Sequence, residues 1–144
     1  MNNSPNFLES CEMLGLNPDE LMLRPTLSDN TPDSVRNRIK QLNAATKLSV
    51  CMMAWNNIDG FKPDEKANYH QEGVGYTPHF NYKDGRLLRC GDAYYSSYAG
   101  LIDVHENIMA IAVGSHIGLR LSLKTTERAI EFGKTFIEIY NELI

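Results

Sequence analysis

Aromatic and cationic side chains are interleaved along residues 76–98 of the sequence, and this combination is typical of surfaces that bind single-stranded nucleic acid. The aromatic residues are Tyr76, Phe80, Tyr82, Tyr94, Tyr95 and Tyr98, and the cations are Lys83, Arg86 and Arg89. Rings on an exposed sheet can stack on bases while neighbouring cations bind phosphates. Because successive side chains of a strand point to opposite faces, at most half of these residues can share one surface. The candidate nucleic-acid contacts are Lys83, Arg86, Arg89, Tyr94 and Tyr95.

The same residues have two other interpretations. Tyr and Arg are also favoured at the centres of protein interfaces, so the surface could bind another protein or a second copy of the chain. Alternatively, one face of the sheet packs on helices and the tyrosines shield its edges. The net charge of −4 provides no overall attraction to phosphate. We therefore expect a protein partner or self-association, with nucleic acid as the alternative.

A second group of polar side chains lies between residues 61 and 79, where His70 and His79 flank three carboxylates, Asp64, Glu65 and Glu72. Zinc sites usually show close helical or CxxC spacing, which this stretch lacks. Ser115 and His116 are adjacent, but no GxSxG motif surrounds the serine. The sequence therefore predicts no catalytic residue, no metal site and no cofactor. A small enzyme with its site near residues 61–79 is a further alternative.

Length and composition indicate one globular domain over residues 1–144. Hydrophobic residues make up 42% of the chain and charged residues 22%, which is typical of a folded protein. The apolar run Val50–Trp55 is far shorter than the roughly 20 residues of a membrane span. Three widely spaced cysteines argue against a disulfide framework. With no signal-peptide pattern at its start, the chain is expected to be cytoplasmic, with no membrane contact.

Helical patterns occupy both ends of the chain. The sequence predicts a first helix from about Pro5 to Leu14, capped by Ser4, and a short second one that begins at Asn17-Pro18. Apolar residues at steps of three and four predict a long helix from Thr31-Pro32-Asp33 to Asn56-Asn57-Gly60. Its first half should be exposed and its second half buried. The last helix should run from Thr125 or Thr126 to about Leu143, with Gly133 packed closely on a neighbouring element.

Alternating patterns predict strands in the middle of the chain. A hairpin is expected from residues 76–82 and 86–90 around the Asp84-Gly85 turn. A further turn at Gly91-Asp92 should lead into a third strand over residues 93–98. Residues 101–112 fit either a strand or a short helix, and residues 115–123 predict a half-buried strand. The fold class is therefore α+β, with an antiparallel sheet between terminal helices.

The C-terminal part of the sequence resembles a known family. Val113–Thr125 (VGSHIGLRLSLKT), followed by Ala129–Tyr140 (AIEFGKTFIEIY), resembles the C-terminal strand and helix of small uncharacterised proteins encoded by Bacteroides-type phages and prophages. The stretches 54–64 and 76–80 are also similar to segments of that family. His116-Ile117-Gly118 departs from it, because the family has an arginine-leucine step there. The resemblance implies a protein of a mobile element that acts in the host cytoplasm or in a virion, and it implies no activity.

Together these observations predict a non-enzymatic phage- or prophage-related protein that binds a partner or assembles with itself. A nucleic-acid-binding accessory protein and a small enzyme are the two alternatives.

Overall fold

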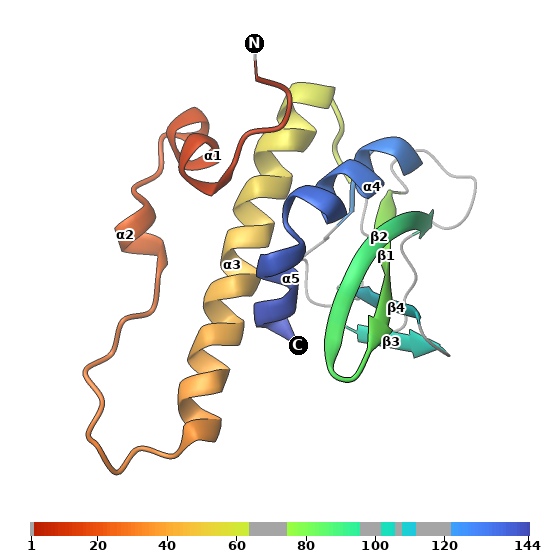
Figure 1. Ribbon diagram of the computed structural model, residues 1–144. Helices are drawn as coiled ribbons and strands as arrows, with labels where there is room; N and C mark the ends of the chain where they lie inside the picture. The colour runs from red at the N-terminus through yellow and green to blue at the C-terminus, as the bar shows by residue number, and fades with distance from the viewer. Residues whose placement is uncertain (1, 64–74, 96–101, 106–107, 112–121) are drawn as a thin grey trace.

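The computed structural model describes residues 2–63, 75–95, 102–105, 108–111 and 122–144 (Figure 1). Helices α1 (Phe7–Leu14), α2 (Pro18–Leu21) and α3 (Asp33–Asp59) precede strands β1 (Tyr76–Lys83), β2 (Arg86–Tyr95), β3 (Ile102–His105) and β4 (Ile108–Ile111), and helices α4 (Thr126–Thr135) and α5 (Ile137–Leu143) follow. The predicted α+β class, with helices at both ends and antiparallel strands between them, is confirmed.

The first helix begins two residues later than predicted. Asn6, and not Ser4, caps α1: its side chain accepts from Glu9 N–H, and the Glu9 carboxylate accepts from Asn6 N–H. This reciprocal pair satisfies two backbone donors that the first turn leaves open. The Ser4 hydroxyl instead donates to Glu131 of α4. Gly15, with φ of 69°, ends the helix as expected.

The long helix α3 forms as its apolar spacing predicts, and Gly60 ends it with φ of 64°. Val35 and Leu42 in its first half are exposed, whereas Leu48, Cys51, Met52 and Trp55 in its second half are buried. The predicted change from an exposed to a buried helix is confirmed. Helix α1 packs beside α3, and an extended segment, residues 22–32, returns along it (Figure 1).

The strands form one antiparallel sheet with the order β2-β1-β4-β3. Asp84 and Gly85, with φ of 51° and 79°, make the predicted hairpin turn between β1 and β2. The predicted turn at Gly91-Asp92 is wrong, because β2 continues through it to Tyr95. His79 pairs with Asp92 and Phe80 pairs with Cys90, so Gly91 has no partner on β1 and forms a bulge. A bulge absorbs the extra residue without reversing the strand.

Residues 102–105 and 108–111 are both strands, which settles the ambiguity of the sequence pattern in that region. The strand predicted over residues 115–123 lies mostly outside the described residues. Its last position, Leu123, forms an antiparallel bridge with Tyr76. The predicted third strand over 93–98 is in part the end of β2, and its residues 96–98 also lie outside the description.

The last helix is interrupted once. Phe136, with φ of −111° and ψ of 19°, separates α4 from α5, so the single predicted helix is two. Gly133 packs closely, as expected, against β1 and β2. A Cβ built on Gly133 would lie 2.5 Å from Cys90 Sγ and 2.9 Å from Pro78 Cβ. Glycine at this position lets α4 approach the hairpin.

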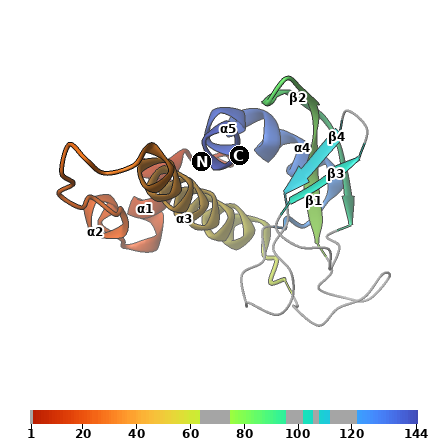
Figure 2. The same cartoon turned by 90° about the horizontal axis from the view of Figure 1, so that it is seen from below.

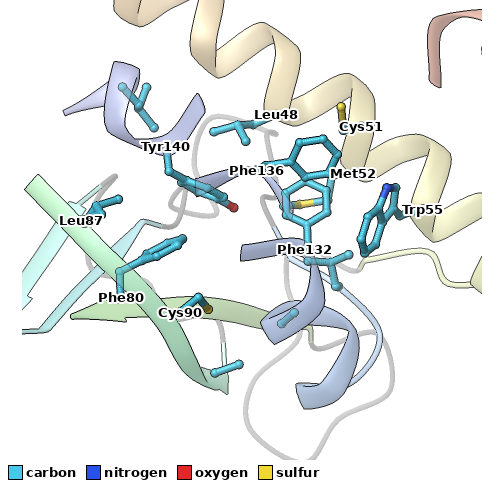
Figure 3. Close-up of a cluster of buried hydrophobic side chains, with 14 of the residues drawn as sticks. Leu48, Cys51, Met52, Trp55, Phe80, Leu87, Cys90, Phe132, Phe136 and Tyr140 are labelled. Carbon is cyan, nitrogen blue, oxygen red and sulfur yellow. The ribbon is translucent and has the colours of Figure 1, made fainter. Parts of the chain in front are cut away.

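Helices α4 and α5 lie between α3 and the sheet, so they contribute to both halves of the core (Figure 2). Phe132 meets Trp55 of α3 edge to face, with ring centroids 4.9 Å apart. Tyr140 meets Phe80 of β1 at 4.7 Å. Figure 3 shows these rings converging from helices and hairpin around Phe136. The aromatic cluster joins elements from the middle and both ends of the chain.

Candidate functional site

The face of the β1–β2 hairpin opposite α4 and α5 gathers several polar and aromatic side chains, and we call it the outer face. Phe80, Leu87, Cys90 and Ala93 are buried on the other face. The register places four cross-strand pairs on the outer face: Thr77 with Tyr94, His79 with Asp92, Asn81 with Arg89, and Lys83 with Arg86. Three of the five predicted nucleic-acid contacts, Lys83, Arg89 and Tyr94, therefore lie on this face, whereas the Arg86 side chain reaches towards α5.

The bulge at Gly91 decides which side chains reach this face. Strict alternation from Tyr94 through Asp92 would place Cys90 on the outer face and Arg89 in the core. The extra residue reverses this order, so Cys90 packs inward and Arg89 points outward. Bulges often redirect side chains in this way beside functional sites.

A shallow cavity of about 210 Å³ opens on the outer face, and we call it the outer hollow. Its lining residues come from the middle of β1 and from β2: His79, Phe80, Asn81, Arg89, Gly91, Asp92 and Tyr94. Small-molecule sites usually measure roughly 300–1,000 Å³. The outer hollow is smaller than these sites and has room for one ring-sized group.

Tyr94 is held at one end of the outer hollow. Its hydroxyl donates to Asp92 Oδ2 at 2.8 Å, and its ring meets the His79 ring edge to face at 4.6 Å. Asp92 Oδ1 accepts from Ala93 N–H at 2.9 Å, which fixes the carboxylate. The hydrogen bond to Asp92 and the charge of that carboxylate raise the pKa of Tyr94. The phenol is thus kept protonated, with an exposed ring in a set orientation.

Arg89 is held at the other end. Its Nε donates to Asn81 Oδ1 at 3.0 Å, which uses one of the five guanidinium N–H groups. No ion pair to Arg89 occurs among the described residues. The guanidinium is therefore positioned by Asn81 and keeps its other donors for an anion.

The remaining predicted contacts are placed differently. Arg86 forms an ion pair with Glu138 of α5 at 3.1 Å, so its charge is partly compensated. Lys83 is exposed beside the hairpin turn. Tyr95 pairs with Tyr76 in the backbone register, and its side chain lies outside the description. His79, Asn81 and Asp92 were not predicted for this site, although alternation along β1 places His79 and Asn81 on one face.

A second candidate surface lies on the N-terminal helices. A hollow of about 470 Å³ is lined by residues of α1, α2, α3 and the segment after α2, and its lining is part apolar and part charged: Phe7, Leu8, Pro18, Asp19, Met22, Arg24, Asn43 and Lys47. Seven of the nine large hydrophobic residues found exposed lie in these helices or their links: Leu8, Met13, Leu16, Leu23, Val35, Leu42 and Met53. We call these seven residues and this hollow the helical surface.

Charge is divided unequally over the helical surface. Residues 2–32 carry five carboxylates and one guanidinium, whereas residues 33–47 carry four cations and one carboxylate. Arg24 and Asp19 form an exposed ion pair at 3.2 Å. Within the described part of the chain, Arg38 and Lys40 have no ion-pair partner. The helical surface therefore has an acidic part and a basic part beside exposed apolar side chains.

The third alternative, an enzyme near residues 61–79, falls largely on residues 64–74, which lie outside the described chain. His79 is described, and it lines the outer hollow. Among the described residues, no three His, Cys, Asp or Glu side chains are grouped closely enough to hold a metal ion. The cysteines are buried and unpaired, and burial raises the pKa of Cys51 to about 12.

No described helix has the length and apolar character needed to cross a membrane. Comparisons with protein-family models, with curated proteins and with solved structures gave no match for this chain. Geometry and chemistry of the two surfaces therefore carry the functional argument.

Proposed function

We propose that this protein is a non-enzymatic binding and assembly protein that associates with a second copy of itself through the helical surface. The observation that carries the proposal is the concentration of exposed large hydrophobic residues on α1, on α3 and in the links beside α2. Exposed apolar groups gathered on one part of a protein, with polar residues around them, are typical of interaction sites.

The charge distribution favours a second copy as the partner. An acidic α1–α2 region and a basic first half of α3 on the same chain are complementary to each other. In a twofold dimer, the acidic region of one copy can face the basic region of the other, and the same contact is then made twice. Complementary charges steer association and set its register, while the apolar side chains supply most of the affinity.

The resemblance of the C-terminal strand and helix to phage and prophage proteins supports a role in a mobile element. In that context the protein would act in the host cytoplasm or in a virion. An assembly role fits both settings, since it needs only a self-complementary surface.

Sedimentation velocity over a range of protein concentrations tests the proposal. Leu42→Glu places a charge on the helical surface, and Leu88→Glu is a matched control on β2, because the two leucines are 48% and 56% exposed. The wild-type chain should dimerise below about 100 µM, a range typical of weak specific association. Leu42→Glu should raise the dissociation constant at least about tenfold, and Leu88→Glu should leave it unchanged.

Two results would count against self-association. One is a wild-type chain that remains monomeric at about 1 mM, since association that weak is negligible. The other is an equal loss of association in both variants, which would remove the helical surface as its site.

A further inference from the structure

We propose that the outer hollow binds one base of a single-stranded nucleic acid, with the adjoining phosphate on Arg89. This site is separate from the helical surface, and its existence does not depend on self-association. It would give an assembly protein a second, nucleic-acid-binding face.

The size and lining of the outer hollow favour a single base. About 210 Å³ suits one planar ring system, and the Tyr94 ring, exposed and fixed through Asp92, offers it a stacking partner. Base stacking on such a ring is a sequence-tolerant source of affinity. The edge-to-face contact of His79 with Tyr94 keeps the stacking ring in place.

The charges determine which end holds the phosphate. Arg89, oriented by Asn81, lines the hollow and keeps further N–H donors, and phosphate is a strong acceptor for a guanidinium. Lys83 lies one outer position beyond Asn81 on β1, about 6.8 Å farther along the strand. A strand that runs from Tyr94 towards the hairpin turn therefore meets two cations in succession.

Asp92 makes the site selective. Its two oxygens accept from Ala93 N–H and Tyr94 O–H, and each oxygen keeps a lone pair for a further donor. A carboxylate beside a bound base favours an exocyclic amino group, as in the readout of cytosine by Asp or Glu. Thymine has a carbonyl oxygen at the equivalent place and would be repelled. The hollow should therefore prefer cytosine to thymine, two bases of similar size.

Fluorescence anisotropy with labelled oligo(dC) and oligo(dT) of about ten nucleotides, at about 50 mM salt, tests the site directly. The full-length wild-type chain should bind oligo(dC) about tenfold more tightly than oligo(dT). Tyr94→Leu should weaken oligo(dC) binding about 5- to 100-fold. Arg89→Gln should weaken it about tenfold and reduce the salt dependence by roughly one phosphate contact.

Three further variants make the test specific. Lys134→Gln removes an exposed cation from α4, outside both the outer hollow and the helical surface, and should leave binding unchanged. Asp92→Asn can still accept from Ala93 N–H through its oxygen and can donate to the Tyr94 hydroxyl through its NH2 group, so it should keep the ring in place while it reduces the preference for oligo(dC). A Cβ on Gly91 meets no atom within 4 Å, so Gly91→Leu can fold normally while its side chain occupies the hollow and blocks binding.

Circular dichroism of each variant establishes that its fold is intact before its affinity is compared. No binding by the wild-type chain at about 50 mM salt would overturn the proposal, because phosphate contacts are strong there. Equal losses in Arg89→Gln and Lys134→Gln would show binding by net charge alone and would also overturn it. Equal affinity for the two oligonucleotides would overturn the base contact and with it the proposed site.

Discussion

Arg128 of α4 connects the N-terminal segment to α3 and α4. Among substitutions of partly exposed residues, Arg128→Ala should be one of the most destabilising. Its Nε donates to Asp59 Oδ2 at 2.7 Å, its Nη1 to Glu131 Oε2 at 3.0 Å, and its Nη2 to the Asn3 carbonyl at 2.6 Å. The guanidinium also lies 4.3 Å from the centre of the Trp55 ring.

The expected magnitude follows from burial. The side chains of Arg128 and Asp59 are only 16% and 17% exposed, so water screens their interaction weakly. Hydrogen bonds to charged groups contribute about 1.5–3 kcal/mol each, and they are not additive within a network. A cation over a tryptophan ring adds about 0.5–1 kcal/mol. Removing the whole side chain should lower the free energy of unfolding by about 3 kcal/mol.

Urea unfolding followed by circular dichroism measures this change, provided that the dependence on urea is the same in both proteins. Arg86→Ala is the matched control. Arg86 also pairs with a glutamate, but the two side chains are 60% and 74% exposed. A pair this exposed contributes about 0–1 kcal/mol. If the two variants lost the same free energy, burial and the Trp55 contact would not explain the importance of Arg128.

Three other predictions concern the core and the N-terminal contacts. Gly133→Ala should destabilise the fold by about 1–3 kcal/mol in thermal or urea unfolding, because its Cβ would press on Cys90 Sγ and on Pro78 Cβ. Cys90→Ala should relieve only the part of this cost that Sγ causes, and a more stable Gly133→Ala protein would refute the close packing. The hydrogen bond from Ser4 and the contact with Arg128 lower the pKa of Glu131 in the folded protein. The Glu131 carboxylate therefore stabilises the fold above its unfolded pKa of about 4.3, and this stabilisation is lost as the pH falls through its pKa in the folded protein. Urea unfolding between about pH 3 and 6 should therefore show a smaller acid-side loss in Glu131→Gln than in the wild-type chain, and equal losses would refute the assignment. Burial raises the pKa of Cys51 to about 12, so its alkylation at pH 8 should proceed at the rate of unfolding, and rapid labelling of the folded protein would contradict its burial.

The elements that local chemistry determines were predictable from the sequence. Gly15 and Gly60 adopt the left-handed conformation that ends a helix, and Asp84-Gly85 makes the turn that their residue types favour. The apolar spacing of α3 also gave its extent and its buried half. The two helix ends and the turn depend on the residues that form them, and the buried half of α3 is marked by its own apolar spacing although later helices cover it.

Features that depend on distant contacts were not predictable. Nothing beside Ser4 indicates that its hydroxyl donates to Glu131, which lies 127 residues later in the sequence. Gly91-Asp92 has the composition of a turn, yet pairing with β1 extends β2 through it as a bulge. That bulge moved Arg89 to the outer face. Arg89 and Tyr94, two of the predicted contacts, therefore line one hollow because of a feature that the sequence pattern did not show.

The contacts of Arg128 also affect the order in which the chain can fold during synthesis. Arg128 bonds to residues 69 and 125 positions earlier in the sequence, and the aromatic partners of Trp55 are Phe132 of α4 and Phe136 between α4 and α5. The buried half of α3 thus emerges from the ribosome long before the helices that cover it. Contacts so distant in sequence slow folding and leave apolar surface open to aggregation. A chain shortened before α4 should consequently be recovered in inclusion bodies or degraded, even though α3 has already been made.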